Sequence, residues 1–149
     1  FKHMTASPIL SGLVGSEMCI RDCYCGELRY ISRGEPQASI QCHCRECQYI
    51  TGGNANVIMI MPLADFKFTK GKPQKFKRND IEKAVTRLFC RTCGTAIGTQ
   101  SPMRPDSIIL KVGTFDNPSI FEPSIAIFTS DKQKFHYIDK NVRSFDKRP

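Results

Sequence analysis

The sequence predicts an all-β, mostly antiparallel single domain with at most one short helix. A chain of 149 residues has the length of one domain with a real hydrophobic core. From residue 23 onward it consists of short extended segments, roughly ten residues apart, separated by turn-forming residues. These segments are dominated by β-branched and aromatic residues, which favour strands over helices.

The first expected strands lie in residues 26–34 (GELRYISRG) and 36–43 (PQASIQCH), where polar and apolar residues alternate. Residues 56–62 (NVIMIMP) form a near-continuous apolar run, which predicts a strand covered on both faces. Between these segments, residues 45–51 (RECQYIT) are the only convincing helical candidate, one or two turns long.

The second half of the chain continues the same pattern. Two segments flank a Gly-Lys-Pro turn and four more follow: 65–71, 73–80, 84–90, 94–100, 106–115 and 124–130. About eight to ten strands at this spacing indicate antiparallel pairing of neighbours.

The first 21 residues show neither a helical nor a strand period. His3 and Met4 look like a cloning remnant, and the run SGLVGSEMCIRD looks like translated sequencing-adapter text. We therefore expect residues 1–21 to be a cloning-derived or artefactual arm with an incidental Cys19. The domain is expected over residues 22–145, followed by a basic tail at 146–149.

The chain is basic, with 22 Lys and Arg against 14 Asp and Glu, a net charge of +8. Such a surface attracts anions, which include nucleic acid, phosphates and anionic thiols. The sequence shows neither a long apolar run nor a secretion signal, so we expect a soluble, cytoplasmic protein without a membrane segment.

Seven of the eight cysteines fall in three short motifs, which read as metal ligands before they read as disulfides. Cys23 and Cys25 share one face of an extended segment, and Gly26 allows the chain to turn after them. Cys90 and Cys93 form a knuckle that Gly94 can close with a positive φ. Four thiolates leave no open position around a zinc ion, so this site is expected to be structural. The alternatives are buried core cysteines or two disulfides.

The third motif, CHCREC, provides only three thiols: Cys42, Cys44 and Cys47. Three protein ligands leave a fourth position for water, hydroxide or an incoming thiol, which is the pattern of catalytic zinc. A redox-active or merely reduced thiol cluster without metal is the alternative. His43 is a weaker candidate for the fourth ligand, because in a strand it points away from its neighbours.

Two other features bear on this site. Gly52 and Gly53 follow the trio, and their backbone N–H groups are either a pocket floor or a plain loop. His3 and His136 lack ligand-like spacing.

The order C-x-C-G, C-x-C-x-x-C-Q and F-C-x-x-C-G-T resembles the glutathione-dependent formaldehyde-activating enzyme (GFA) family, which includes the centromere-protein-V-like proteins. The resemblance covers roughly residues 22–145 and implies a β-tent fold. It implies a structural zinc on Cys23, Cys25, Cys90 and Cys93 and a catalytic-type zinc on Cys42, Cys44 and Cys47. Three positions depart from the family pattern: Asp22 replaces the usual glycine, Ala126 a histidine and Phe135 a tryptophan.

Two functions remain open. The resemblance implies a carbon–sulfur lyase in which a small thiol such as glutathione binds at the open zinc and condenses reversibly with a small aldehyde such as formaldehyde. The alternative is a zinc-stabilised binding module whose basic surface holds nucleic acid or an acidic protein. Phe66, Phe68 and Phe76 alternate with lysines there, but alternating strand residues are more often core. A thiol–disulfide oxidoreductase has little support, since no C-x-x-C opens a helix in a βαβ context.

Overall fold

The computed structural model describes residues 19–149, with side chains from residue 21 onward. Most of the expected N-terminal arm therefore lies outside the described residues. The last part of it does not, because β1 (Cys19–Asp22) pairs along its whole length with β2 (Arg29–Ser32). Arg21 is buried and lies 3.7 Å above the ring of Phe115. The boundary expected at residue 22 thus falls inside a strand of the domain.

The described chain contains strands, one α-helix and short 3-10 helices. After β1 and β2, the strands are β3 (Ala38–Cys42), β4 (Asn56–Pro62), β5 (Phe66–Lys70), β6 (Gln74–Lys77), β7 (Thr86–Phe89), β8 (Ala96–Ser101), β9 (Arg104–Lys111), β10 (Ile125–Ile127) and β11 (Arg143–Ser144). The helix is α2 (Arg45–Thr51), and the 3-10 helices are η2 (Leu63–Asp65), η3 (Val112–Thr114), η4 (Pro118–Ile120) and η5 (Thr129–Asp131).

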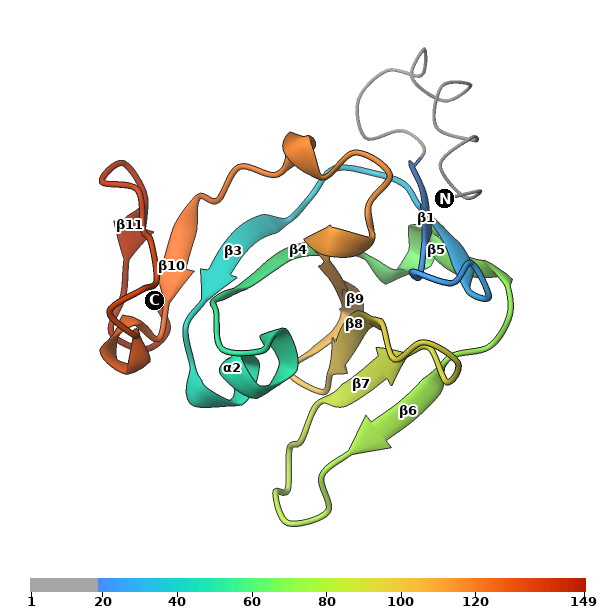
Figure 1. Cartoon of the computed structure of the whole chain (residues 1–149), viewed down its shortest axis with the longest axis horizontal. Helices are drawn as coiled ribbons and strands as arrows, with labels where there is room; N and C mark the ends of the chain where they lie inside the picture. Colours follow the sequence, from blue (N-terminus) through green and yellow to red (C-terminus); the bar gives the residue numbers. More distant parts are fainter. Residues whose placement is uncertain (1–18) are drawn as a thin grey trace.

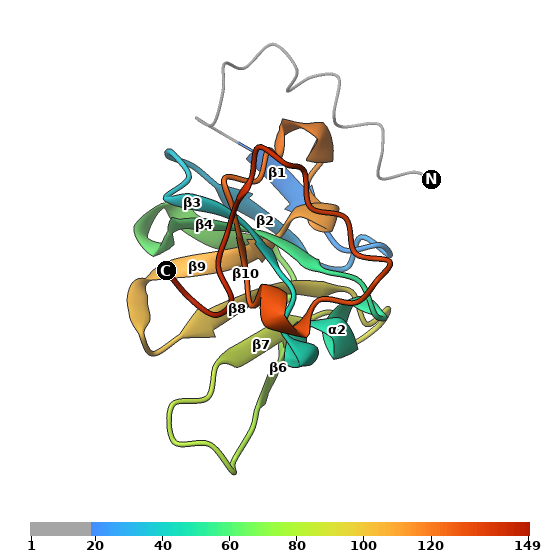
Figure 2. The ribbon, with the colours of Figure 1, turned by 90° about the vertical axis from the view of Figure 1, so that its left-hand side faces the viewer.

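The strands form two sheets, one on either side of the main core (Figures 1 and 2). The smaller sheet has the order β1-β2-β5 and the larger has the order β11-β10-β3-β4-β9-β8-β7-β6. Among the strands of residues 19–149, only β10 pairs in parallel, with β3 on one side and β11 on the other. The prediction of an all-β, mostly antiparallel single domain with one short helix is therefore confirmed.

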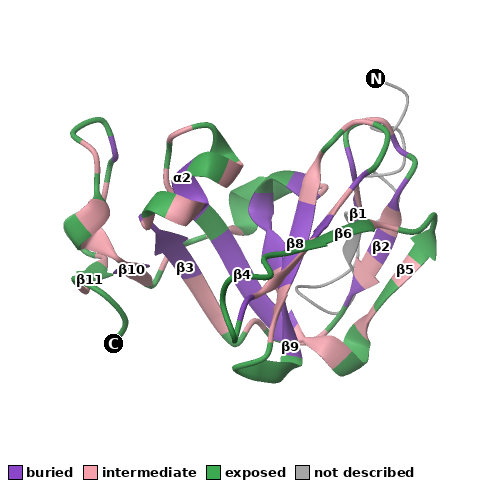
Figure 3. Ribbon diagram, turned by 90° about the horizontal axis from the view of Figure 1, so that it is seen from below, coloured by how far each residue is buried: buried purple, intermediate pink, exposed green. Residues whose placement is uncertain are grey.

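β4 lies in the middle of the larger sheet and is buried on both faces, as its apolar run predicted (Figure 3). Met59 and Met61 belong to the main core, together with the fully buried Tyr30 of β2. Ile58 and Ile60 belong to a second cluster on the opposite face. Because β4 follows α2 directly, its double burial fixes the position of the helix and of the cysteines beside it.

The phenylalanines of the basic segment 66–77 differ in burial. Phe66 and Phe68 pack against Tyr30, with ring centroids 5.2 and 6.1 Å away. Phe76 is 54% exposed, on the edge strand β6, whose four residues are all exposed (Figure 3). The expectation that all three phenylalanines are core residues is wrong for Phe76, because an edge strand beyond β7 has no layer covering it.

The C-terminal residues are attached to the larger sheet. The N–H of Phe145 donates to the carbonyl of Ala126, and the N–H of Phe128 donates to the carbonyl of Lys147. The basic tail expected at 146–149 is thus held at its first residues. Within the described residues, no helix is long and apolar enough to span a membrane.

Candidate metal centres

The structure brings the cysteine pairs Cys23–Cys25 and Cys90–Cys93 together. The Sγ atoms of Cys23, Cys25, Cys90 and Cys93 all lie within 4.8 Å of one another. The Sγ of Cys25 is 3.6 Å from that of Cys23 and 3.7 Å from that of Cys90, although 65 positions separate it from Cys90. Cys23 and Cys90 are each 1% exposed. Four converging thiols of this kind can hold a tetrahedral zinc ion.

The backbone around these cysteines forms two knuckles. Gly94 adopts a φ of +79°, as predicted for its knuckle, and Gly26, where a turn was predicted, has a φ of +81°. In the first knuckle the N–H of Leu28 donates to Cys23 Sγ at 3.3 Å. In the second, the N–H groups of Thr92 and Cys93 approach Cys90 Sγ at 3.4 and 3.5 Å. Burial raises the pKa of the Cys23 thiol, and the N–H of Leu28 partly offsets this effect.

Thr95 joins the two knuckles, a role that the sequence did not reveal. Its Oγ1 lies 3.0 Å from Cys93 Sγ and accepts a hydrogen bond from the N–H of Tyr24 at 3.1 Å. Burial opposes ionisation of Cys93, but hydrogen bonds with Thr95 and Cys25 together outweigh it and lower the pKa of the thiol to about 6. This thiol is therefore prepared for metal binding at neutral pH.

The second cluster is built locally, at the junction of β3 and α2. Cys42 ends β3, Cys44 is the N-cap of α2, and Cys47 lies in the helix. The N–H of Cys47 donates to Cys44 Sγ at 3.3 Å, so a single turn folds the motif onto itself. Their three Sγ atoms lie within 4.8 Å of one another, and no other described His, Cys, Asp or Glu joins them.

The surroundings of the trio favour ionised sulfur at Cys47, while the pKa values of Cys42 and Cys44 are raised. Contacts with the thiols of Cys42 and Cys44, together with the amide of Asn56, lower the pKa of Cys47 to about 3. Asn56 Nδ2 donates to Cys47 Sγ at 3.3 Å. The contacts with its two neighbours raise the pKa of Cys42 in turn. A soft, partly ionised group of three sulfurs fits a zinc ion and leaves one coordination position for another ligand.

His43 does not join the trio and is instead fully buried on the opposite side of the chain. Its Nδ1 lies 2.8 Å from Nδ1 of His136, which also accepts from the N–H of Gln133 at 3.3 Å. His136 Nε2 donates to the carbonyl of Gly53 at 2.8 Å, and Gln41 Nε2 donates to His43 Nε2 at 3.2 Å. When both imidazoles are neutral, each of their four ring nitrogens has a hydrogen-bond partner.

Burial, with smaller contributions from His136 and Lys132, lowers the pKa of His43 to about 4, which keeps it neutral at pH 7. The pair ties the CHC motif to the C-terminal segment and to the loop after α2. The sequence did not predict this contact, since 93 positions separate the two histidines.

We expect His136→Ala to lower the free energy of unfolding by about 3 kcal/mol, because it opens a cavity and leaves the Nδ1–H of His43 without an acceptor. Urea denaturation of the zinc-loaded protein measures this. Lys134→Ala changes an exposed side chain two positions away and should be neutral. A loss below about 1 kcal/mol for His136→Ala would contradict a structural role for the pair.

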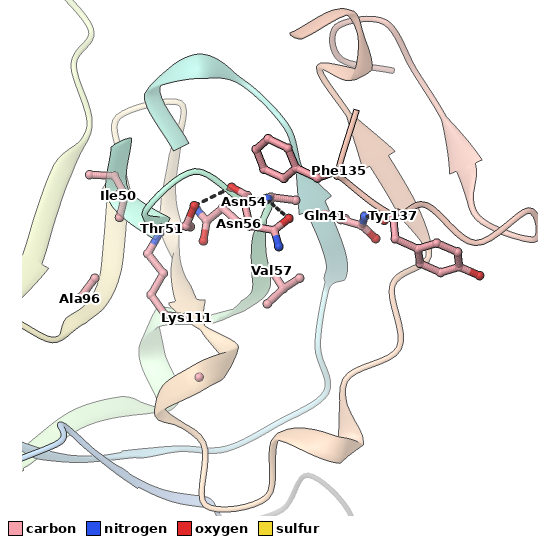
Figure 4. A pocket seen from close by; sticks show the side chains of 12 residues that line it. Gln41, Ile50, Thr51, Asn54, Asn56, Val57, Ala96, Lys111, Phe135 and Tyr137 are labelled. Carbon is pink, nitrogen blue, oxygen red and sulfur yellow. Dashed lines mark hydrogen bonds between the residues drawn. The ribbon is translucent and has the colours of Figure 1, made fainter. Parts of the chain in front are cut away.

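An open groove of about 590 Å³ is lined by residues that neighbour the trio, although none of the three cysteines lines it. Figure 4 shows the residues that line this groove. Its lining includes Asn56, which donates to Cys47 Sγ, Thr51 at the end of α2, and Asn54 from the loop after it. Gly52 and Gly53 do not line this groove, so their neighbours form the wall. Phe135 and Tyr137, 67% and 75% exposed, lie at the far end.

Lys111, the last residue of β9, lines this groove and also a second one of about 370 Å³. Figure 4 shows its side chain extending toward Thr51. Lys111 is only 8% exposed. Burial lowers its pKa to about 8, although the nearby Cys47 opposes this effect.

Comparison with known proteins agrees with the cysteine pattern. The model of the family described as "Glutathione-dependent formaldehyde-activating enzyme" matches residues 18–131, which is well over half of the chain. The crystal structure of a Rhodobacter sphaeroides protein from a structural genomics programme shares the fold, with a TM-score of 0.54 at 19% identity. The match covers 70% of this chain and 96% of that one. No curated protein matches the sequence significantly.

Proposed function

Because this chain belongs to the glutathione-dependent formaldehyde-activating enzyme family, we propose that it is a zinc-dependent carbon–sulfur lyase acting on adducts of a small thiol and a small aldehyde. In the forward direction the thiol sulfur bonds to the carbonyl carbon, and the thiol proton ends on the carbonyl oxygen. The reverse reaction breaks the same bond. Cys42, Cys44 and Cys47 carry the proposal, since they form a cluster without a fourth ligand beside an open groove.

The two clusters are proposed to divide the work. Cys23, Cys25, Cys90 and Cys93 would hold a structural zinc, and Cys42, Cys44 and Cys47 would hold the second ion. At the second site, bound zinc supplies a Lewis acid that keeps a substrate thiol ionised, and therefore nucleophilic, at neutral pH.

The chain's own residues hold this site in place. Asn56 fixes the orientation of Cys47 by donating to its sulfur. The buried His43–His136 pair holds the β3–α2 junction from behind and fixes Gly53 through its carbonyl. The groove walls then present neutral hydrogen-bonding groups to a polar substrate. These residues position the substrate, which supplies the effective concentration that a bimolecular addition needs.

Of the two C-terminal departures from the family pattern, Ala126 and Phe135, only Phe135 lines the groove. Ala126 is fully buried in β10, beside Gln41 of β3. Phe135, where the family usually has tryptophan, lines the groove. We propose that the ring at this position affects which thiol and aldehyde the groove accepts, so glutathione and formaldehyde are the first pair to test.

Exchange NMR on a mixture of glutathione and formaldehyde tests the proposed activity. We expect the zinc-loaded protein to raise the exchange rate between free glutathione and its S-hydroxymethyl adduct at least about ten-fold over the uncatalysed rate. Metal analysis of the same sample should give one zinc for each of the two clusters. An unchanged exchange rate at full zinc loading would exclude this substrate pair.

The nucleic-acid alternative draws less support from the structure. Six exposed basic residues lie within the segment 66–78, but Phe66 and Phe68 pack against the core. Within the described chain, Phe76 is thus the only phenylalanine of this segment available for stacking on a base. Sequence-tolerant binding of single strands uses several exposed aromatic residues interleaved with the basic ones.

A further inference from the structure

Lys111 is a buried cation that pairs with no carboxylate in the described part of the chain. None of the four ion pairs in the described part of the chain includes it. Its ammonium also makes no hydrogen bond to a described residue. Burying an unpaired charge is costly, so such a group normally has a counter-charge or a ligand. The position of Lys111 in the walls of two grooves makes a ligand accessible to it.

Arg87 provides the contrast. It lines the second groove together with Lys111, but its guanidinium lies 3.1 Å from the carboxylate of Glu46. Its charge is therefore satisfied within the protein. Lys111 is the only charged side chain of the first groove, whose other polar lining groups are neutral amides, hydroxyls and backbone. That groove offers one free positive charge, which suits a monoanion better than a phosphate dianion.

Lys111 lines the same groove as Asn56, whose amide donates to Cys47 Sγ at 3.3 Å, so it lies near the cysteine trio. Its electrostatic partners include Cys47, Cys42 and Cys44. An anionic group held by Lys111 would consequently lie within a short chain length of a sulfur bound at the trio. A small thiol that carries a carboxylate has both groups at such a separation.

We propose that Lys111 is a specificity-determining residue that binds the carboxylate of a carboxylate-bearing thiol substrate. This inference rests on the proposed function, because it takes the trio as the site of the thiol. A purely structural role, in which Lys111 balances the negative charge of three thiolates around a dication, makes a different prediction. In that case the substitution of Lys111 affects metal retention but not the choice between charged and neutral thiols.

Calorimetric titration of the zinc-loaded full chain separates these roles. The probes are 3-mercaptopropionate, the neutral 3-mercaptopropionamide of the same length, and propionate. We expect the wild type to bind 3-mercaptopropionate at least about ten-fold more tightly than the amide, and Lys111→Met to bind both equally. Lys111→Arg, which keeps the charge, should retain a preference. Lys83→Met, at an exposed lysine, is the matched control and should behave as the wild type.

Several outcomes would overturn the inference. They are equal binding of the two thiols by the wild type, a preference that survives in Lys111→Met, and a lower zinc content in Lys111→Met with the preference retained. Absence of binding by both carboxylate probes would overturn it too. If propionate binds in a manner that depends on Lys111 while 3-mercaptopropionate binds no more tightly than propionate, the anion site stands and the proposed thiol function fails.

Discussion

Cys90→Ser is expected to leave the chain unable to fold. Cys90 is 1% exposed and accepts two backbone N–H groups of its knuckle, so its sulfur is central to the four-cysteine cluster. A structural zinc contributes on the order of 10 kcal/mol or more to folding, whereas a domain of this size has a net stability of about 5–15 kcal/mol. Loss of one ligand removes much of the stabilisation that zinc provides, and this loss is as large as the net stability of the domain.

The topology explains why this one cluster has so large an effect. Cys23 and Cys25 follow β1 in the smaller sheet, and Cys90 and Cys93 separate β7 from β8 in the larger sheet. The cluster therefore joins the two layers around the main core, to which both Cys23 and Cys90 belong. Without it, β1, β2 and β5 form a three-stranded sheet joined to the rest mainly by packing.

Circular dichroism and metal analysis of the purified variant measure this effect. Thr92→Ala, at an exposed position in the same knuckle, is the matched control and should keep the wild-type fold and zinc content. A strong chelator should reproduce the Cys90→Ser phenotype in the wild type. If Cys90→Ser unfolds at the same urea concentration as Thr92→Ala, the cluster does not stabilise the domain.

The sequence predicted the parts of the molecule that depend on local pattern. The helix expected over 45–51 agrees with α2, because local residues set both of its ends: Cys44 is the N-cap and Gly52 is the C-cap. The two-sided burial of β4 follows from its continuous apolar run. The positive φ of Gly94 follows from its position after paired cysteines, and Gly26 lies where a turn was predicted.

Contacts between distant segments were not predictable in the same way. The His43–His136 pair joins residues with no shared motif, and β11 has only two residues. β1 was missed because its sequence looks foreign, yet its backbone pairs with β2 whatever its origin. Lys111 did leave a signal, since it interrupts the apolar run IILKV of a predicted strand. A lone lysine within the apolar run of a strand indicates a buried charge that needs a counter-charge or a ligand.

Cys42→Ser should have the opposite phenotype to Cys90→Ser: a folded protein without activity. Cys42 ends β3, and its trio is built within one local segment, so losing a ligand here separates no layers of the fold. Serine is nearly isosteric with cysteine and keeps a hydrogen-bonding group beside Cys44 and Cys47. We expect the variant to retain one zinc, on the four-cysteine cluster, and to unfold at nearly the wild-type urea concentration.

The expected loss is in the exchange between free thiol and adduct, which should fall by about 100-fold or to the uncatalysed rate, because two sulfurs hold the ion and its thiol ligand poorly. Cys19→Ser makes the same chemical change at the one cysteine outside the three motifs and should keep both zinc ions and full exchange. Metal analysis, urea denaturation and exchange NMR on Cys42→Ser, Cys19→Ser and the wild type together measure the three quantities. Two results would refute the assignment of separate roles to the two clusters: unfolding of Cys42→Ser to the same extent as Cys90→Ser, or exchange by Cys42→Ser at the wild-type rate.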